Sequence, residues 1–318
     1  MKVVVTGAAG FLGSRLADLL LSNNSPLPVK ELILVDNFAP TKNDPRVRNI
    51  KIDLSEPGAA DKLISPDVDV FFHLAAIVSG HAEVDFDLGF RVNFDATSSL
   101  LEAARAKAPK MKFVFTSTCG VFGGKLPPVL DDLTALMPEN TYGITKAMCE
   151  LMINDYSRKG FVDGRVVRLP TVSVRAGVAN KAVTSFASGI VREPLNGVES
   201  VCPVPSSLKL WLTGPEKVVR NIVHAAIVPA SGLGSWRVVN LPGITVTVAE
   251  MLDALKTVAG ESVASLVRFE EDKMISGMVA TFPAKFDNSR ALKLGFEVDS
   301  NYADIIRAYI RNDLKKKI

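Results

Sequence analysis

The chain has 318 residues, of which 47% are hydrophobic and 22% charged, and its formal net charge is +3 at pH 7. This balance excludes a disordered chain and gives no indication of nucleic acid as a partner. The first predicted strand begins at residue 3, leaving no room for a signal peptide, and no stretch approaches the roughly 18 apolar residues of a membrane span. The three cysteines have no metal spacing. The sequence therefore predicts a cytoplasmic protein with free thiols, no membrane partner and no metal site.

The first predicted element is a strand that meets a glycine-rich turn. The apolar run Val3–Val5 is followed by Gly7, Gly10 and Gly13, and a helical pattern continues through residues 14–21. Glycines at this junction let the backbone turn sharply and approach a pyrophosphate, while the helix N-terminus attracts an anion. The pattern predicts a dinucleotide-binding unit.

A second apolar strand, residues 31–36, ends in a carboxylate. Asp36 follows Gly13 by 23 residues, close to the offset of about 20 residues expected for the group that holds the adenosine ribose hydroxyls. A carboxylate would repel the 2′-phosphate of NADP, and Asn37 follows it directly where an NADP enzyme would favour an arginine. The sequence therefore predicts NAD as the cofactor, with Asp36 and Asn37 beside it.

The next two strand ends also face the predicted crevice. Asp53 and Leu54 close a short strand and could hold the adenine amino edge, although Asp53 is equally suited to cap a helix that starts near Glu56. The strand over residues 68–76 runs into a loop of small residues, and ligands in an open parallel sheet lie beyond the carboxyl ends of its strands. The predicted contacts from this segment are Leu74, Ala75 and Ala76 with the cofactor and Ser79 and His81 with the substrate.

Two polar residues are predicted at buried positions. His73 lies within a strand and is interpreted as a core histidine with hydrogen-bond partners. Asn93 interrupts the apolar stripe of a helix predicted over residues 91–105, and a polar group there needs partners. We expect its amide to tie neighbouring loops together, with direct cofactor contact as a secondary role.

The strand over residues 112–119 becomes hydroxylic at its carboxyl end, where Ser117 and Thr118 could donate to a substrate oxygen. A helix then opens at residue 141 with Tyr142 and Lys146, which are four residues apart and therefore share one face. An ammonium group beside a phenol stabilises the phenolate and lowers its pKa from the usual value of about 10. The pattern predicts Tyr142 as a general base.

Together these residues resemble the motifs of the extended short-chain dehydrogenase/reductase family. The resemblance covers nearly the whole chain, and one departure is Phe122, where relatives usually have a tyrosine. The matching stretches are Thr6–Gly13 (TGxxGFLG), Asp53–Leu54, His73–Ala76 (HxAA), Asn93, Tyr142–Lys146 (YxxxK) and Phe286–Phe296.

The resemblance and the strand pattern imply an α/β fold, a Rossmann-type doubly wound parallel sheet of about seven strands with a smaller C-terminal substrate lobe. We expect residues 1–170 to form the NAD-binding domain and residues 171–318 mainly the lobe, with some segments returning to the sheet. The resemblance also implies a homodimer that pairs through the helices containing Asn93 and Tyr142.

For the site, the resemblance implies Tyr142 as the catalytic acid/base, Lys146 as a residue that also holds the nicotinamide ribose, and Thr118 as the catalytic hydroxyl. The remaining cofactor contacts that it implies are Gly7, Gly10, Phe11, Leu12, Gly13, Asn93, Pro170 and Thr171.

Within the family, residues 117–124, 168–175 and 187–194 resemble the NAD-dependent members that oxidise a four-carbon sugar acid at C2. Cys119 and Gly120 follow Thr118 where sugar-nucleotide dehydratases carry two acids, and residues 176–214 hold few aromatics to stack a nucleobase. A nucleotide-sugar epimerase with tightly bound NAD stays open as the alternative. A non-catalytic NAD-binding regulatory protein is disfavoured by the intact Thr118, Tyr142 and Lys146.

A sugar acid requires a cation for its carboxylate, and arginine binds carboxylates bidentately. Arg175 lies six residues beyond the strand that ends at Leu169 and is the first candidate, followed by Lys181 and Arg192. The predicted substrate contacts are Ser79, His81, Thr118, Cys119, Tyr142 and Arg175.

Overall fold

The computed structural model describes residues 1–178 and 182–314. Seven strands form a central sheet in the order β10-β6-β5-β4-β1-β2-β3, and every pairing between them is parallel. The chain runs outward in both directions from β1 and β4, which is the doubly wound arrangement predicted from the sequence. The strands are β1 (Lys2–Thr6), β2 (Glu31–Asp36), β3 (Val47–Lys51), β4 (Val70–His73), β5 (Lys112–Thr118), β6 (Asp163–Leu169) and β10 (Val238–Asn240).

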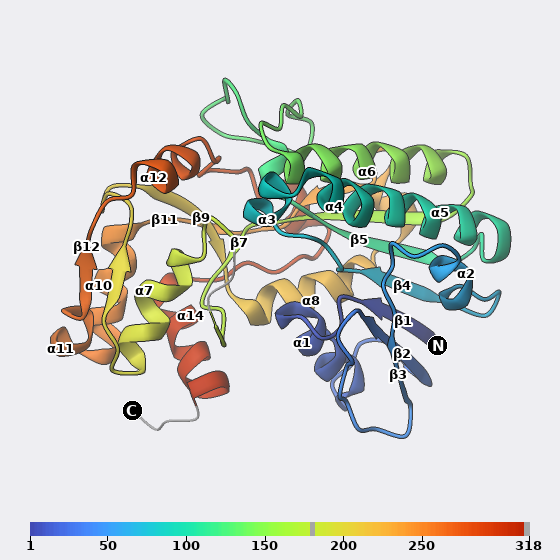
Figure 1. Ribbon diagram of the computed structural model, residues 1–318, viewed down its shortest axis with the longest axis horizontal. Helices are drawn as coiled ribbons and strands as arrows, with labels where there is room; N and C mark the ends of the chain where they lie inside the picture. The colour runs from blue at the N-terminus through green and yellow to red at the C-terminus, as the bar shows by residue number, and fades with distance from the viewer. Residues whose placement is uncertain (179–181, 315–318) are drawn as a thin grey trace.

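Helices cover both faces of this sheet (Figure 1). Helices α3 to α6 lie over one face, and α1 and α8 lie over the other. A π-helical turn over Arg91–Asp95 joins α4 to α5, so the predicted helix over residues 91–105 extends further at both ends. The helices are α1 (Phe11–Leu21), α2 (Ala59–Leu63), α3 (Ser79–Val84), α4 (Phe86–Phe90), α5 (Ala96–Lys107), α6 (Thr141–Arg158) and α8 (Pro215–Ala225).

The central strands are apolar on both faces because helices bury both faces of the sheet. Val3–Val5 in β1 and Phe113–Phe115 in β5 are completely buried, as are Phe71 and Phe72 in β4. One hydrophobic core forms between the sheet and α1 and α8, and a second forms between the sheet and α2, α5 and α6. The strands thus hold their carboxyl ends rigidly along one edge.

A smaller lobe follows β6, at the left of Figure 1. It contains one sheet of strands β11-β9-β7 and a pair of strands, β12 and β8, and it has a hydrophobic core of its own. Its elements are β7 (Thr171–Val172), α7 (Phe186–Leu195), β8 (Ser200–Cys202), β9 (Lys209–Thr213), β11 (Ile244–Thr247), α10 (Val248–Ala259), α11 (Glu261–Ala264), β12 (Val267–Phe269), α12 (Lys273–Ala280) and α14 (Tyr302–Tyr309).

The segments after residue 170 do not all stay in this lobe. Strand β10 pairs with β6 at the edge of the large sheet, and α8 packs against α1. Two short helices flank this return, α9 (Ala230–Leu233) and α13 (Ser289–Lys293). None of the helices in residues 1–178 and 182–314 is long and apolar enough to span a membrane.

Candidate active site

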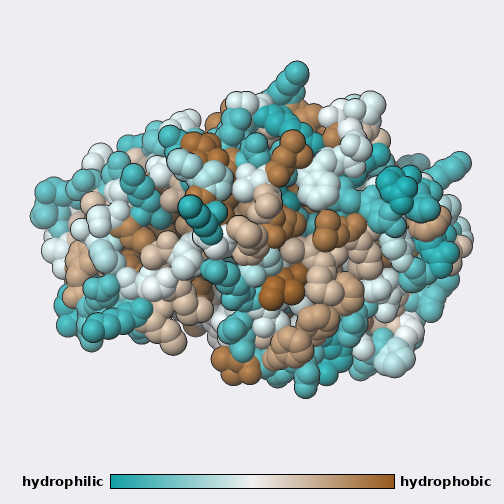
Figure 2. All heavy atoms as spheres, turned by 90° about the horizontal axis from the view of Figure 1, so that it is seen from above, coloured by the Kyte–Doolittle hydropathy of each residue, from teal (hydrophilic) through white to brown (hydrophobic). Residues whose placement is uncertain are grey.

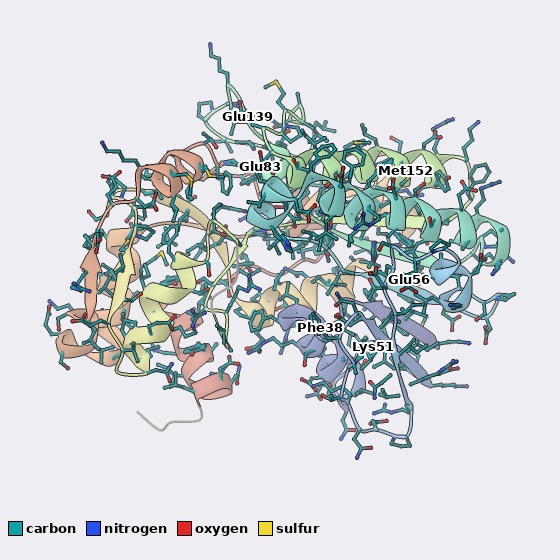
Figure 3. All side chains as sticks on the ribbon, viewed as in Figure 1. Phe38, Lys51, Glu56, Glu83, Glu139 and Met152 are labelled. Carbon is teal, nitrogen blue, oxygen red and sulfur yellow. The ribbon has the colours of Figure 1, made fainter. Side chains whose placement is uncertain are left out.

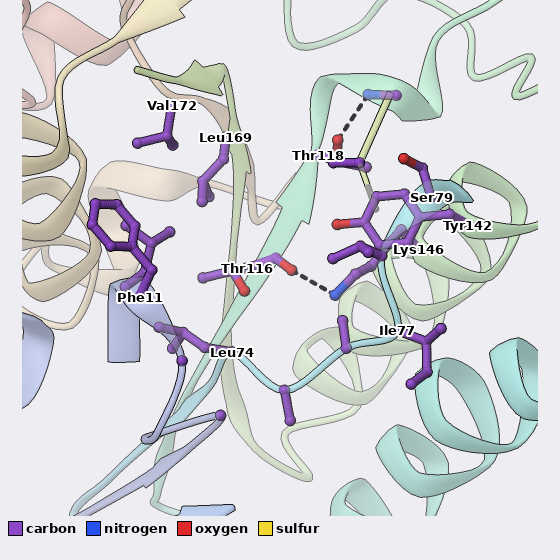
Figure 4. Close-up of a pocket in the computed structure, with 18 of the residues that line it drawn as sticks. Phe11, Leu74, Ile77, Ser79, Thr116, Thr118, Tyr142, Lys146, Leu169 and Val172 are labelled. Carbon is purple, nitrogen blue, oxygen red and sulfur yellow. Dashed lines mark hydrogen bonds between the residues drawn. The ribbon is translucent and has the colours of Figure 1, made fainter. Parts of the chain in front are cut away.

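A cavity of about 820 Å³ lies beyond the carboxyl ends of the large sheet, between the sheet and the lobe. Among the described residues, every predicted catalytic, cofactor and first-choice substrate residue except Asn93 lines it, from Gly7 in the first turn to Arg175 in the lobe, whereas the second-choice cation Arg192 does not. The close-up in Figure 4 shows Tyr142 and Thr118 facing the same space as Phe11 and Leu74. The fold therefore brings the predicted residues, which span most of the chain, into one site.

The glycine-rich turn has no room for side chains at two of its positions. Gly7 has a φ of +71°, and a Cβ there would lie 2.8 Å from the backbone nitrogen of Ala75. A Cβ on Gly13 would overlap the carbonyl oxygen of Gly7. Gly10 precedes the first turn of α1, whose free N–H groups open toward the cavity. This geometry fits the pyrophosphate of a dinucleotide.

Two carboxylates, one at the end of β2 and one just beyond β3, line the cavity. Asp36 accepts hydrogen bonds from the backbone N–H groups of Ala9 (3.0 Å) and Phe38 (3.2 Å), which fixes it beside the glycine-rich turn. Asp53 accepts from the hydroxyl and backbone N–H of Ser55, and these bonds lower the pKa of its carboxyl. Helix α2 begins after Gly58 instead, so the alternative in which Asp53 caps that helix is wrong.

Helix α6 carries Tyr142 and Lys146 into the site. Its N-terminus is capped by Asn140, whose side chain accepts from the backbone N–H of Gly143 (2.8 Å). The Lys146 ammonium is buried, donates to the carbonyl oxygen of Thr116 (2.9 Å) and lies 5.8 Å from the centre of the Tyr142 ring. Thr118, two residues further along β5, accepts from the backbone N–H of Gly120 (3.0 Å), and its own hydroxyl proton stays available.

The predicted pKa effect of Lys146 on Tyr142 is wrong for the protein alone. Burial raises the pKa of Tyr142 to about 12, and the cation that opposes this rise is Arg175. Burial also lowers the pKa of Lys146 to about 8. The ammonium is directed at the Thr116 carbonyl and so has little influence on the phenol. In this protein, desolvation outweighs the attraction that the four-residue spacing suggested.

The two buried polar residues have the partners that were predicted for them. Asn93 accepts from the backbone N–H of Ile77 (2.8 Å) and donates to its carbonyl oxygen (3.0 Å), which ties the loop after β4 to the helix below the cavity. His73 lies between the hydroxyls of Thr6 (2.7 Å) and Thr97 (3.0 Å), and burial lowers its pKa to about 3. The histidine is therefore neutral.

Strand β4 ends at His73, three residues before the predicted end. The chain leaves the sheet there because Leu74 and Ala75 pass directly against Gly7 of the first turn. The following loop and α3 bring Ser79 and His81 to the cavity wall.

Comparison with known proteins identifies the family. The family model described as "NAD dependent epimerase/dehydratase family" matches residues 3–226, which is more than half of the chain. The chain belongs to this family. The site residues fit its cofactor, since a glycine-rich turn without space for side chains and a fixed carboxylate lie together at the carboxyl edge of a parallel sheet.

Three known proteins are similar to this chain over nearly its whole length. A D-erythronate dehydrogenase from Haemophilus influenzae is 51% identical over 99% of this chain and 100% of the relative, and one from Cupriavidus necator is 49% identical over 98% of each. A solved structure described as a nucleoside-diphosphate-sugar epimerase from Agrobacterium tumefaciens has a TM-score of 0.95 and 40% identity, covering 100% of this chain and 95% of that one.

Arg175 brings a positive charge from the lobe to the cavity beside Tyr142. Arg175 lines the cavity, lies 5.5 Å from the centre of the Phe11 ring, and has its backbone N–H bonded to Ser188 (3.0 Å). Burial lowers the pKa of its guanidinium, and an anion beside it would oppose this shift by favouring the charged form. Arg192 is buried and donates to the carbonyl oxygen of Arg175 (2.9 Å). Lys181, the third predicted cation, lies outside the described residues.

Sequence reasoning missed part of the cavity lining. Thr116 could have been found, because it lies two residues before Thr118 and side chains on a strand alternate. Lys209 and Trp211 come from β9, and Phe282 follows α12, so these three reach the cavity from distant parts of the lobe. No local pattern in the sequence marks them.

Proposed function

We propose that this chain is an NAD-dependent D-erythronate dehydrogenase, which oxidises its substrate at C2 to the 2-oxo acid. The observation that carries the proposal is the identity of 51% and 49% to two D-erythronate dehydrogenases over nearly the full length of all three chains. Arg175, a cation, lines the same cavity as the hydroxyl pair Thr118 and Tyr142. This combination suits a 2-hydroxy acid.

The reacting groups have distinct roles. Tyr142 as phenolate accepts the proton of the C2 hydroxyl, and Thr118 donates a hydrogen bond that fixes the same oxygen. Lys146 holds the nicotinamide ribose. When bound, NAD supplies the hydride acceptor.

The phenolate needs stabilisation because the pKa of Tyr142 is about 12 in the protein alone. Arg175 supplies part of it, since its charge lowers the pKa of Tyr142, and the same guanidinium binds the substrate carboxylate. Ser79, His81 and Cys119 line the cavity as the remaining substrate contacts.

The cofactor is held from the glycine-rich turn to the start of the lobe. The turn binds the pyrophosphate, Asp36 with Asn37 binds the adenosine ribose, and Asp53 with Leu54 binds the adenine edge. Asn93 acts through the loop that it holds rather than by direct contact. The stretches Leu74–Ala76 and Pro170–Thr171 border the nicotinamide half.

The proposal includes a cytoplasmic homodimer. Phe86 on α4 is 57% exposed and Leu151 on α6 is 56% exposed, and apolar residues gather over the middle of this face (Figure 2). Met152, beside Leu151 on α6, is only partly buried, and Glu83 and Glu139 lie near the start of this helix (Figure 3). A second copy would cover this apolar surface. The variant Leu151→Asp should be a monomer in light scattering, whereas a monomeric wild-type protein would reject the pairing.

The experiment that tests the proposed activity follows the absorbance of NADH with purified protein, added NAD and a panel of four-carbon to six-carbon sugar acids. Strong turnover of D-erythronate supports the proposal. The name of the Agrobacterium tumefaciens relative makes a nucleotide-sugar epimerase the second candidate. An epimerase would convert a UDP-sugar with no added cofactor and no net NADH, so silence on every acid together with epimerised UDP-sugar would replace the first proposal by the second.

A further inference from the structure

A row of buried polar side chains crosses the sheet just behind the candidate catalytic groups. Ser117 on β5 pairs in register with Arg168 on β6, and Arg168 pairs with Asn240 on β10. Paired residues point to the same face of a sheet. Helix α6 packs against β5 and β6, and it places Glu150 against this row.

Glu150 accepts hydrogen bonds from two members of the row. The Ser117 hydroxyl donates to its Oε1 (2.5 Å), and Arg168 donates from Nε to Oε1 (3.0 Å) and from Nη2 to Oε2 (2.7 Å). The side chains of Glu150 and Arg168 are fully buried. Arg168 also donates to Asn240 (3.3 Å), and its guanidinium carbon lies 4.8 Å from the centre of the Phe122 ring. The ion pair therefore joins one helix to three strands.

The row lies next to every group proposed to act on the C2 hydroxyl. Glu150 follows Lys146 by one helical turn and Tyr142 by two, while Ser117 directly precedes Thr118. Lys146 donates to the carbonyl oxygen of Thr116. Two consecutive residues at the end of β5 are thus bonded to α6, one through Lys146 and one through Glu150.

A buried ion pair at this position contributes little net stability compared with apolar residues of similar volume. Removing two charges from water costs more than their attraction commonly returns, and well-packed apolar residues of similar volume are often as stable or more stable. What the pair does supply is a fixed geometry, because a bidentate guanidinium–carboxylate contact tolerates little displacement.

We propose that Glu150 is a positioning residue for the dehydrogenation. Through Ser117 and Arg168 it fixes the separation between Tyr142 on α6 and Thr118 at the end of β5, and it holds the end of β6 that leads into Pro170 and the nicotinamide side. This inference rests on the proposed function, because it concerns the placement of the groups that remove the C2 proton.

The test separates positioning from stability. The single variant Glu150→Leu leaves the Arg168 guanidinium buried without its partner, and it should melt at a much lower temperature than the wild type. The double variant Glu150→Leu/Arg168→Met removes both charges and should recover most of the melting temperature. We expect its kcat with D-erythronate to stay about 10- to 100-fold below wild type, since small displacements of reacting groups cost this much. Its KM for NAD should stay unchanged.

A milder pair of variants gives a matched control. Ser117→Ala removes one bond between α6 and β5 and leaves the ion pair intact, and kcat should fall about tenfold. Ser157, at the other end of α6, accepts from the backbone N–H of Gly164 on β6 (3.1 Å) and lies outside the cavity lining. Ser157→Ala should lower the melting temperature and leave kcat unchanged.

A double variant that regains wild-type kcat along with its melting temperature would overturn the positioning role, as would a Ser117→Ala variant with wild-type kcat. A wild-type enzyme silent with D-erythronate rejects the proposed function instead, and the same variants are then compared on the substrate that the wild-type enzyme does turn over.

Discussion

The two walls of the cavity are built in different ways. The sheet wall consists of strand ends and close backbone approaches, and its polar groups, from Asp36 to Lys146, are held by hydrogen bonds to neighbouring backbone. The lobe wall consists of side chains such as Arg175, Trp211 and Phe282, which come from separate segments of the lobe. We infer from this difference that the cofactor and the proton transfer depend on the rigid sheet wall, whereas the choice of substrate depends mainly on the lobe wall.

The largest effect is expected on the sheet wall at Tyr142. Tyr142→Phe removes the group that accepts the proton and should lower kcat by about 10²- to 10⁴-fold with little change in the KM for NAD. Tyr156, on the same helix, bonds to Glu102 at the surface and lies outside the cavity lining. Tyr156→Phe should retain wild-type kcat, and equal losses in both variants would mean that α6 had simply been damaged.

On the lobe wall, the strongest effect is expected at Arg175. Arg175→Lys keeps the charge but loses the two parallel N–H groups that bind a carboxylate. The KM for D-erythronate should therefore rise about 10- to 100-fold, which corresponds to the free energy of a hydrogen bond to a charged group. An unchanged KM would remove Arg175 from the substrate site. Arg175→Met should in addition raise the pKa of Tyr142, because the positive charge that lowers it is lost. The kcat/KM profile for oxidation should therefore move to higher pH.

A smaller effect is expected at the adenosine end of the sheet wall. Asp36→Asn removes the charge that repels a 2′-phosphate, and the ratio of kcat/KM with NAD to that with NADP should fall about tenfold. Asp44 lies outside the cavity lining and pairs with Arg46 at the surface, so Asp44→Asn serves as the control. A ratio that stays the same in both variants would show that Asp36 does not select the cofactor.

The last effect concerns the stability of the sheet wall and not its chemistry. His73 has a pKa of about 3 when folded against an ordinary 6.5, so the unfolded chain binds the extra proton between these values. Its contribution to stability is complete above pH 6.5 and is lost as the pH falls toward 3, at up to about 1.4 kcal/mol per pH unit. His73→Gln should flatten the dependence of melting temperature on pH in this window. Parallel curves for both proteins would contradict the assignment.

The sheet wall could be predicted from the sequence because local patterns determine it. The glycine-rich turn is recognisable because a strand precedes it and a helix follows it, and the carboxylate at the end of the second strand lies beside that turn. The positions of Gly7 and Asp36 could therefore be predicted from the sequence. The family is confirmed by the comparisons, and the doubly wound sheet is found in the structure.

The lobe wall and the network behind the sheet could not be predicted, because long-range packing creates them. Glu150 reads in the sequence as an ordinary helical glutamate, and its burial depends on Arg168 arriving from β6. The wrong expectation for the pKa of Tyr142 has the same origin, since the spacing of Lys146 gives proximity but not the depth of burial.

The measurement that tests the central claim most directly uses D-erythronate carrying deuterium at C2. We predict that hydride leaves C2, the carbon next to the carboxylate that Arg175 binds. The NADH formed should then carry the deuterium, and the mass of the 2-oxo acid should show that it has lost the deuterium. NADH formed without deuterium from this substrate would mean that another carbon is oxidised, and it would contradict the account of both walls.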